Sequence, residues 1–171
     1  MDLRRFIRDV PDFPRPGVVF KDITPLLKDP AAFRYAIDRF TEQWTGRGID
    51  VVVTIESRGF LFGSPLAYNL GVPLVPVRKA GKLPADRMTA EYTLEYGSSQ
   101  LDIHRDALSP GQRVAIVDDL IATGGTAEAT AKLVELLGAR VEGFTFLVEL
   151  ATLGGRQRLQ AYDVFSLILY E

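Results

Sequence analysis

Residues 114–126, with the sequence VAIVDDLIATGGT, decide how the rest of the chain is interpreted. The segment begins with an apolar, largely β-branched run that is typical of a strand buried on both faces of a sheet. Two carboxylates, Asp118 and Asp119, follow at the end of that run. Small and hydroxyl-bearing residues come next, before an expected helix: Ala122, Thr123, Gly124, Gly125 and Thr126. The segment therefore predicts a strand, a ligand-binding loop and a helix in succession.

This loop has the chemistry of a phosphate site. Glycines let backbone N–H groups approach an anion closely, and the following helix N-terminus favours negative charge. Adjacent carboxylates would repel a phosphate, but they suit a polyol between them, because a carboxylate accepts hydrogen bonds from two vicinal hydroxyls. They also suit a hard cation such as Mg²⁺. The pattern thus indicates a ribose 5-phosphate, and the alternative interpretation is a capped helix preceded by solvated acids.

The remaining pattern alternates between strands and helices. Apolar runs predict strands over residues 50–55, 72–77, 113–117, 141–150 and 164–170, and the prolines of 72–77 indicate an edge or irregular strand. Helical spacing follows the Asp29-Pro30 start signal, and it recurs over 60–70 and 126–137, where Leu133, Leu136 and Leu137 are expected to face inward. This alternation predicts an α/β fold with a mainly parallel central sheet flanked by helices.

Residues 79–104 interrupt this alternation. Residues 79–91 show neither a strand nor a helix period, whereas 92–96 and 100–104 alternate like the two strands of a hairpin. We interpret the stretch as a flap inserted into one domain that spans residues 1–171.

Composition excludes several classes of function. The chain has 171 residues, no Cys, one His and a net charge of −2, which excludes a disulfide scaffold, a Cys nucleophile and a His-rich metal site. The charge argues against a nucleic-acid partner. No apolar run approaches the ~20 residues that span a bilayer, and the N-terminus lacks a signal-peptide core. We therefore expect a cytoplasmic protein without a membrane partner.

Residues 114–126 resemble the phosphoribosyl-pyrophosphate signature of the type I phosphoribosyltransferases. Five further segments are similar to the adenine-specific branch of that family: PDFPRPGVVFKDITPLLKDP at 11–30, ESRGFLFG at 56–63, RKAGKLP at 78–84, YTLEYG at 92–97 and LVEL at 147–150. The resemblance implies the type I phosphoribosyltransferase fold, with a small hood over about residues 1–30 and a flexible flap over about 79–104. It also implies transfer of 5-phosphoribosyl from phosphoribosyl pyrophosphate to adenine, Mg²⁺ as cofactor, and a homodimer.

A second anion site is indicated where the strand 50–55 ends. Arg58 lies at that strand end beside Gly59, and a basic run follows strand 72–77. The resemblance implies that these segments grip pyrophosphate through Glu56, Ser57, Arg58, Arg78, Lys79 and Lys82. It also implies a cis peptide at Glu56–Ser57, and Mg²⁺ held through the donor's pyrophosphate and ribose hydroxyls without an all-protein site.

The base pocket is assigned by the same resemblance. Residues 14–21 contain too many prolines for a helix or central strand, and we expect a rigid irregular arm. Phe20 and Leu150 are implied to sandwich adenine, and the backbone of Val19 and Lys21 to read its Watson–Crick edge. The family more often has Arg at the position of Lys21, which a backbone contact would tolerate.

Four residues are implied to be catalytic: Glu95, Arg58, Asp118 and Asp119. Glu95 is expected to act as the acid or base near N7 of adenine. Two alternatives stay open. One is a phosphoribosyltransferase for another purine base, and the other is a donor-sensing regulator of the same fold without catalysis, which would ordinarily need a DNA-binding segment.

Overall fold

A computed structural model of the chain describes residues 1–93 and 98–171. The strands of the described part are β1 (Arg8–Pro11), β2 (Val19–Asp22), β3 (Val51–Ile55), β4 (Leu74–Lys79), β5 (Arg87–Thr93), β6 (Ser98–His104), β7 (Arg113–Ile121), β8 (Arg140–Leu150) and β9 (Asp163–Tyr170). The α-helices are α1 (Thr24–Lys28), α2 (Pro30–Trp44), α3 (Gly59–Leu70), α4 (Gly125–Leu136) and α5 (Gly155–Arg158). Two short 3₁₀ helices, η1 (Leu3–Phe6) and η2 (Ala151–Leu153), complete the described elements.

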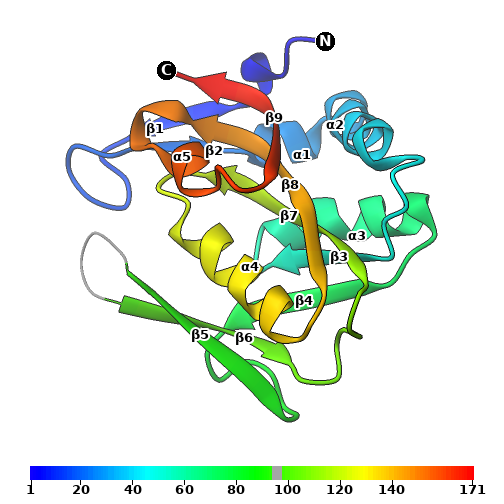
Figure 1. Ribbon diagram of the computed structural model, residues 1–171. Helices are drawn as coiled ribbons and strands as arrows, with labels where there is room; N and C mark the ends of the chain where they lie inside the picture. The colour runs from blue at the N-terminus through cyan, green and yellow to red at the C-terminus, as the bar shows by residue number, and fades with distance from the viewer. Residues whose placement is uncertain (94–97) are drawn as a thin grey trace.

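The central sheet has the order β5-β6-β4-β3-β7-β8-β9 (Figure 1). β4, β3, β7, β8 and β9 pair in parallel, which confirms the predicted mainly parallel α/β fold. β5 and β6 form an antiparallel hairpin that joins the sheet where β6 pairs with β4 at Arg78 and Lys79. Pro76 precedes that short pairing with β6, so at this residue β4 pairs only with β3. The other side of the strand is open there, and the missing N–H of proline is therefore tolerated.

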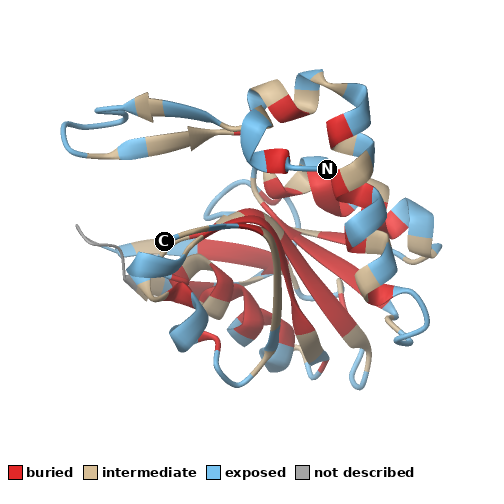
Figure 2. Cartoon of the chain, turned by 90° about the horizontal axis from the view of Figure 1, so that it is seen from above, coloured by how far each residue is buried: buried red, intermediate tan, exposed pale blue. Residues whose placement is uncertain are grey.

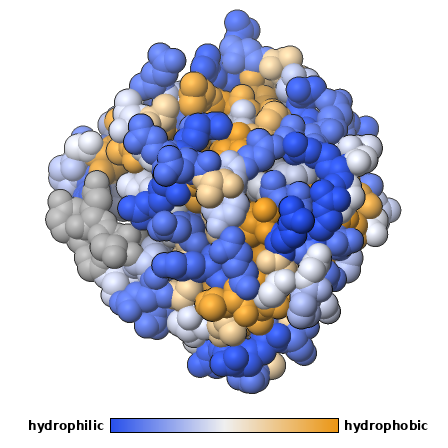
Figure 3. Space-filling view, viewed as in Figure 1, coloured by the Kyte–Doolittle hydropathy of each residue, from blue (hydrophilic) through white to orange (hydrophobic). Residues whose placement is uncertain are grey.

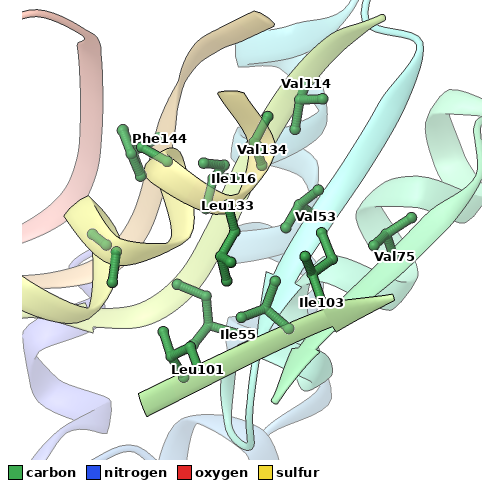
Figure 4. Close-up of a cluster of buried hydrophobic side chains, with 14 of the residues drawn as sticks. Val53, Ile55, Val75, Leu101, Ile103, Val114, Ile116, Leu133, Val134 and Phe144 are labelled. Carbon is green, nitrogen blue, oxygen red and sulfur yellow. The ribbon is translucent and has the colours of Figure 1, made fainter. Parts of the chain in front are cut away.

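Helices cover both faces of the sheet (Figures 1 and 2). On one face, side chains of α4 such as Leu133 and Val134 pack on Val53, Ile55 and Ile116 (Figure 4). On the other face, the first three α-helices pack on the alternate residues of the same strands, including Val52 and Val117. Successive strand residues point to opposite faces, so β3 and β7 are buried on both sides, as their continuous apolar runs predict.

The start of α2 follows the predicted signal. The carboxylate of Asp29 accepts hydrogen bonds from the N–H groups of Ala31 and Ala32, at 3.0 and 2.9 Å, and Pro30 occupies the first helical position. At the other end of the helix, the Trp44 indole N–H donates to the buried Thr145 hydroxyl at 2.7 Å. This bond fixes the end of α2 to β8, at the residue that pairs with Val117 of the motif.

Three details of the sequence interpretation were wrong. Residues 87–91 are strand, because Met88 and Ala90 alternate toward α4. Part of the arm at 14–21 is also strand: β2 pairs with β1 in a separate two-stranded sheet, an outer position that tolerates nearby prolines. Leu136 does not face inward but is 62% exposed, because the helix buries the stripe that contains Leu133 and Val134.

The β1–β2 hairpin projects from the body of the molecule on the side of the N-terminal segment (Figures 1 and 2). The surface in Figure 3 is mostly hydrophilic, with smaller apolar areas between polar groups. None of the helices within the described residues is long and apolar enough to cross a bilayer.

Candidate active site

The motif residues meet at one edge of the sheet. β3, β4, β7 and β8 run parallel, so their carboxyl ends lie together, which is where open α/β sheets bind ligands. A cavity of about 300 Å³ opens there. It is lined by Glu56, Ser57, Arg58, Lys79, Tyr92, Leu101, Asp118, Asp119, Leu120 and Thr126. Residues predicted for the sugar and the pyrophosphate thus share one space, with β5 and β6 of the flap along one side.

Asp118 lies against the N-terminus of α3. A Cβ added to Gly59, the first residue of that helix, would lie 2.8 Å from Asp118 Oδ1 and 3.1 Å from the Val117 carbonyl. Glycine is therefore required for the helix to approach the carboxylate so closely. Asp118 Oδ1 also accepts a hydrogen bond of 2.8 Å from the Asp119 N–H. Burial, followed by the neighbouring charge of Asp119, raises the pKa of Asp118 well above its ordinary value.

Arg58 joins Asp119 to the hood. Its Nε lies 2.8 Å from Asp119 Oδ2, and the side chain of Asp119 is only 7% exposed. Burial raises the pKa of Asp119 above its ordinary value, and the charge of Arg58 opposes that rise. The guanidinium carbon of Arg58 also lies 5.0 Å from the centroid of the Phe20 ring, within cation–π range. One side chain therefore brings the predicted base, leaving-group and sugar sites together.

The small-residue loop forms a second hollow of about 170 Å³ beside the first. Its lining includes Asp118 and the whole of residues 122–126. Gly124 has φ +80° and precedes α4, which begins at Gly125, one residue before the predicted start. Among the described residues no side chain caps this helix, and its first N–H groups, which have no intrahelical acceptor, belong to residues that line the hollow. That arrangement suits a phosphate.

The pyrophosphate residues fall into two groups. Arg58, Ser57 and Lys79 line the larger cavity. Arg78 is instead paired with Glu56, through Nε–Oε2 and Nη2–Oε1 contacts of 3.1 and 3.2 Å, and it donates to the Lys82 carbonyl at 3.2 Å. Although burial opposes the shift, hydrogen bonds from Arg78 and the Lys79 N–H lower the pKa of Glu56. Glu56 and Arg78 thus shape the basic turn that carries Lys79. The peptide bond between Glu56 and Ser57 is cis, which confirms that prediction.

The open edge of β2 carries the backbone groups assigned to the base. Pro11 pairs with Val19 but has no N–H, so this pair cannot be the hydrogen-bonded kind. Hydrogen-bonded and non-hydrogen-bonded pairs alternate along an antiparallel ladder, so the pair of Asp9 with Lys21 is also non-hydrogen-bonded. The backbone N–H and C=O groups of Val19 and Lys21 therefore point away from β1. The Lys21 ammonium is occupied elsewhere, 2.7 Å from Asp9 Oδ1 and 3.9 Å from the centroid of the Tyr170 ring.

Leu150, the last residue of β8, packs partly buried on the same face of the sheet as the hood residues. Glu95, predicted as an acid or base, lies outside the described residues.

Sequence reasoning missed a set of residues that support the site from behind. Gly59 allows the approach of α3 to Asp118, and Gly155 packs on the small-residue loop. Arg156 pairs with the buried Glu149. The Gly154-Gly155 pair was the available signal, since a glycine pair near a ligand loop often marks close backbone packing.

Comparison with known proteins agrees with this geometry. The model of the phosphoribosyl transferase domain matches residues 26–168. An adenine phosphoribosyltransferase of Synechococcus sp. is 56% identical over 171 residues, covering 100% of both chains. The crystal structure of adenine phosphoribosyltransferase from Thermoanaerobacter pseudethanolicus, 56% identical, superposes with a TM-score of 0.96 over 99% of this chain and 98% of that one.

A more distant structure has the same fold. Adenine phosphoribosyltransferase from Saccharomyces cerevisiae, solved with an imino-altritol bisphosphate and adenine, is 44% identical, with a TM-score of 0.91 over 97% of this chain and 96% of that one. On these matches and on the shared sheet edge, the chain belongs to the phosphoribosyltransferase family, in its adenine phosphoribosyltransferase branch.

Proposed function

We propose that the chain transfers the 5-phosphoribosyl group of phosphoribosyl pyrophosphate to adenine, releasing AMP and pyrophosphate. One observation carries the proposal: paired carboxylates, a small-residue hollow at a helix N-terminus and an arginine under an aromatic ring lie together at one sheet edge. Relatives that are named adenine phosphoribosyltransferase and match the whole chain support the choice of base.

The donor's 5-phosphate would bind to residues 122–126. The N–H groups at the start of α4 donate to its oxygens, and the hydroxyls of Thr123 and Thr126 add further donors. Next to this hollow, Asp118 and Asp119 would accept hydrogen bonds from the ribose hydroxyls. Their negative charge also lies near the sugar carbon that gains positive charge as the pyrophosphate leaves, so it stabilises that transition state.

The leaving pyrophosphate would lie against Ser57, Arg58 and Lys79. Two cations there balance the charge that develops on the departing oxygen. Glu56 and Arg78 would act with them by holding the turn that carries Lys79 and Lys82. Closure of the flap over these groups would exclude water, which otherwise could hydrolyse the donor.

Magnesium is part of the proposal. Asp119 Oδ2 is buried without a hydrogen-bond partner among the described residues, although Arg58 balances its charge. Mg²⁺ is a hard cation that prefers oxygen ligands, and the two neighbouring carboxylates offer them. Asp118 and Asp119 are the residues that would hold it in place, together with the donor's pyrophosphate and ribose hydroxyls. When bound, Mg²⁺ neutralises part of the leaving group's charge.

Adenine would bind between Phe20 and Leu150. Its faces are apolar, so an aromatic ring and an aliphatic side chain suit them. Its Watson–Crick edge would pair with the outward backbone groups of Val19 and Lys21, which leaves the occupied Lys21 ammonium without a role in base recognition. Glu95 would hydrogen-bond near N7 and balance charge as N9 attacks the sugar.

We further propose a cytoplasmic homodimer. Exposed apolar side chains on α3 and at the start of β4 offer a surface for a second copy: Leu61 is 43%, Tyr68 86% and Leu74 39% exposed. Sedimentation equilibrium tests this part, and a chain that stays monomeric at micromolar concentration contradicts it.

Incubation of the purified chain with phosphoribosyl pyrophosphate, Mg²⁺ and each purine in turn tests the function. We expect AMP and pyrophosphate to form from adenine in equal amounts. Preferential turnover of guanine or hypoxanthine would reassign the base. Donor binding without turnover of any purine would favour the regulator that the sequence left open.

A further inference from the structure

The helix α5 packs directly behind the phosphate hollow. A Cβ added to Gly155 would lie 2.4 Å from the Ala122 carbonyl oxygen and 2.7 Å from Ile121 Cγ1. In the opposite direction, a Cβ on Gly124 would lie 2.8 Å from the Gly155 carbonyl oxygen. The two backbones are therefore in contact with no side chain between them. A displacement of α5 toward the loop would therefore push on the backbone of Ala122 and Gly124.

Arg156 fixes this short helix to the sheet. Its Nε and Nη2 donate to the two oxygens of Glu149, at 2.8 and 2.5 Å, and its Nη1 donates to the Val164 carbonyl at 2.8 Å. Ser166 Oγ donates to Glu149 Oε2 at 2.7 Å. The Glu149 side chain is only 4% exposed, and hydrogen bonding from Arg156 lowers its pKa. A four-residue helix is too short to be stable by itself. The bidentate contact between Arg156 and Glu149 therefore stabilises the position of α5 on the sheet.

The same strand end serves the base pocket on its other face. Glu149 and Leu150 are consecutive in β8, so their side chains point to opposite faces of the sheet. Leu150 packs on the hood side, whereas Glu149 faces α5. Arg156 is not among the described residues that line the two cavities of the site. It reaches the loop through its neighbours: Gly155 contacts the loop backbone, and Glu149 pairs with Ile121 across β7 and β8.

We propose that Arg156, through its pair with Glu149, is a positioning residue for the donor's phosphate, because it holds α5 against the backbone of residues 122–124. The inference rests on the proposed function, since it assigns a phosphate to that hollow. It concerns a residue that touches neither the sugar nor the base, and its signature is a selective loss of donor affinity.

The test compares Arg156→Gln with Arg113→Gln. Arg113 makes a matched bidentate pair with Glu142, at 3.0 and 3.1 Å, at the opposite end of the sheet. We expect Arg156→Gln to raise the donor KM about tenfold and to leave the adenine KM within about twofold. This effect is smaller than the ~100-fold loss of rate that a 1 Å misplacement of reacting groups can cause. Affinity for ribose 5-phosphate, measured by calorimetry, should fall equally. Arg113→Gln should leave both KM values unchanged.

Two further variants keep the inference testable if Arg156→Gln unfolds. Arg156→Lys retains the charge and should restore part of the donor affinity. Gly155→Ala pushes on Ala122 directly and should raise the donor KM with Arg156 intact. An unchanged donor KM in these variants, or an equal rise in Arg113→Gln, overturns the inference. A wild-type chain that forms no AMP and binds no ribose 5-phosphate overturns the proposed function instead.

Discussion

Replacement of Arg58 by Gln removes the cation that joins the sugar and pyrophosphate sites. It leaves the Asp119 carboxylate, 7% exposed, without its ion-pair partner. At the observed 2.8 Å, two unit charges attract by about 6 kcal/mol at an effective dielectric constant of ~20 and by about 1.5 kcal/mol in water. Because the Arg58 side chain is 38% exposed, solvent screens the pair and the cost lies near the lower limit. We expect a loss of about 2 kcal/mol in the free energy of unfolding.

The pH dependence of this loss has a definite sign. Burial raises the pKa of Asp119, and Arg58 opposes the rise, so the Arg58→Gln variant has a still higher pKa at Asp119. The ion pair stabilises the fold only while Asp119 is ionised. The difference in stability between wild type and variant should therefore be full at neutral pH and should shrink as the pH falls through the pKa of Asp119 in the folded variant.

Thermal and urea unfolding of wild type, Arg58→Gln, Asp119→Asn and the double variant form a cycle that isolates the pair. We expect a fall of about 4–8 °C in the melting temperature of Arg58→Gln, since 1 kcal/mol shifts a chain of this size by about 2–4 °C. kcat/KM for the donor should fall about 100-fold, the range for loss of one preorganised donor to a developing charge. A coupling within about 0.3 kcal/mol of zero, or a difference that grows toward acid pH, would refute the reasoning.

Three further predictions use other parts of the site. Asp118→Asn should weaken donor binding yet raise the melting temperature at neutral pH, because burial and Asp119 raise the pKa of Asp118, so its ionised form opposes folding. The gain in melting temperature should vanish in acid, and a melting temperature that falls at neutral pH contradicts the prediction. Gly124→Ala should cost about 1–2 kcal/mol of stability for its left-handed backbone, and more because the added Cβ would lie 2.8 Å from the Gly155 carbonyl oxygen. It should also raise the donor KM, and an unchanged donor KM would be the contrary result. Lys21→Arg should leave the adenine KM within about twofold, since the Lys21 ammonium binds Asp9; a tenfold rise would mean that the side chain reads the base.

The sequence predicted the sheet well because its central strands are buried on both faces. Continuous apolar runs such as residues 51–55 and 114–117 leave no polar face, and helices on both sides are then required. The flap was harder, because strand β5 packs on the core with one face only, through Met88, Ala90 and Tyr92. Leu136 was misplaced for a related reason: a helix with several leucines fits more than one inward stripe, and only the neighbouring strands select one.

Motif residues could be assigned, but their partners could not. Asp118, Asp119 and the glycine loop follow one another in the chain, so a local pattern contains them. The contact of Arg58 with Asp119 and Phe20 joins three segments far apart in the sequence, and no local periodicity encodes it. The role of Gly155 likewise depends on a backbone approach across the sheet edge, which a single sequence expresses only as a glycine pair.

A crystal structure of the chain with AMP tests the central assignment most directly. We expect the 5-phosphate against the N–H groups of residues 122–126, the ribose hydroxyls on Asp118 and Asp119, and the adenine ring between Phe20 and Leu150. A nucleotide bound with its phosphate at any other place, and with the hollow before α4 filled only by solvent, would contradict it.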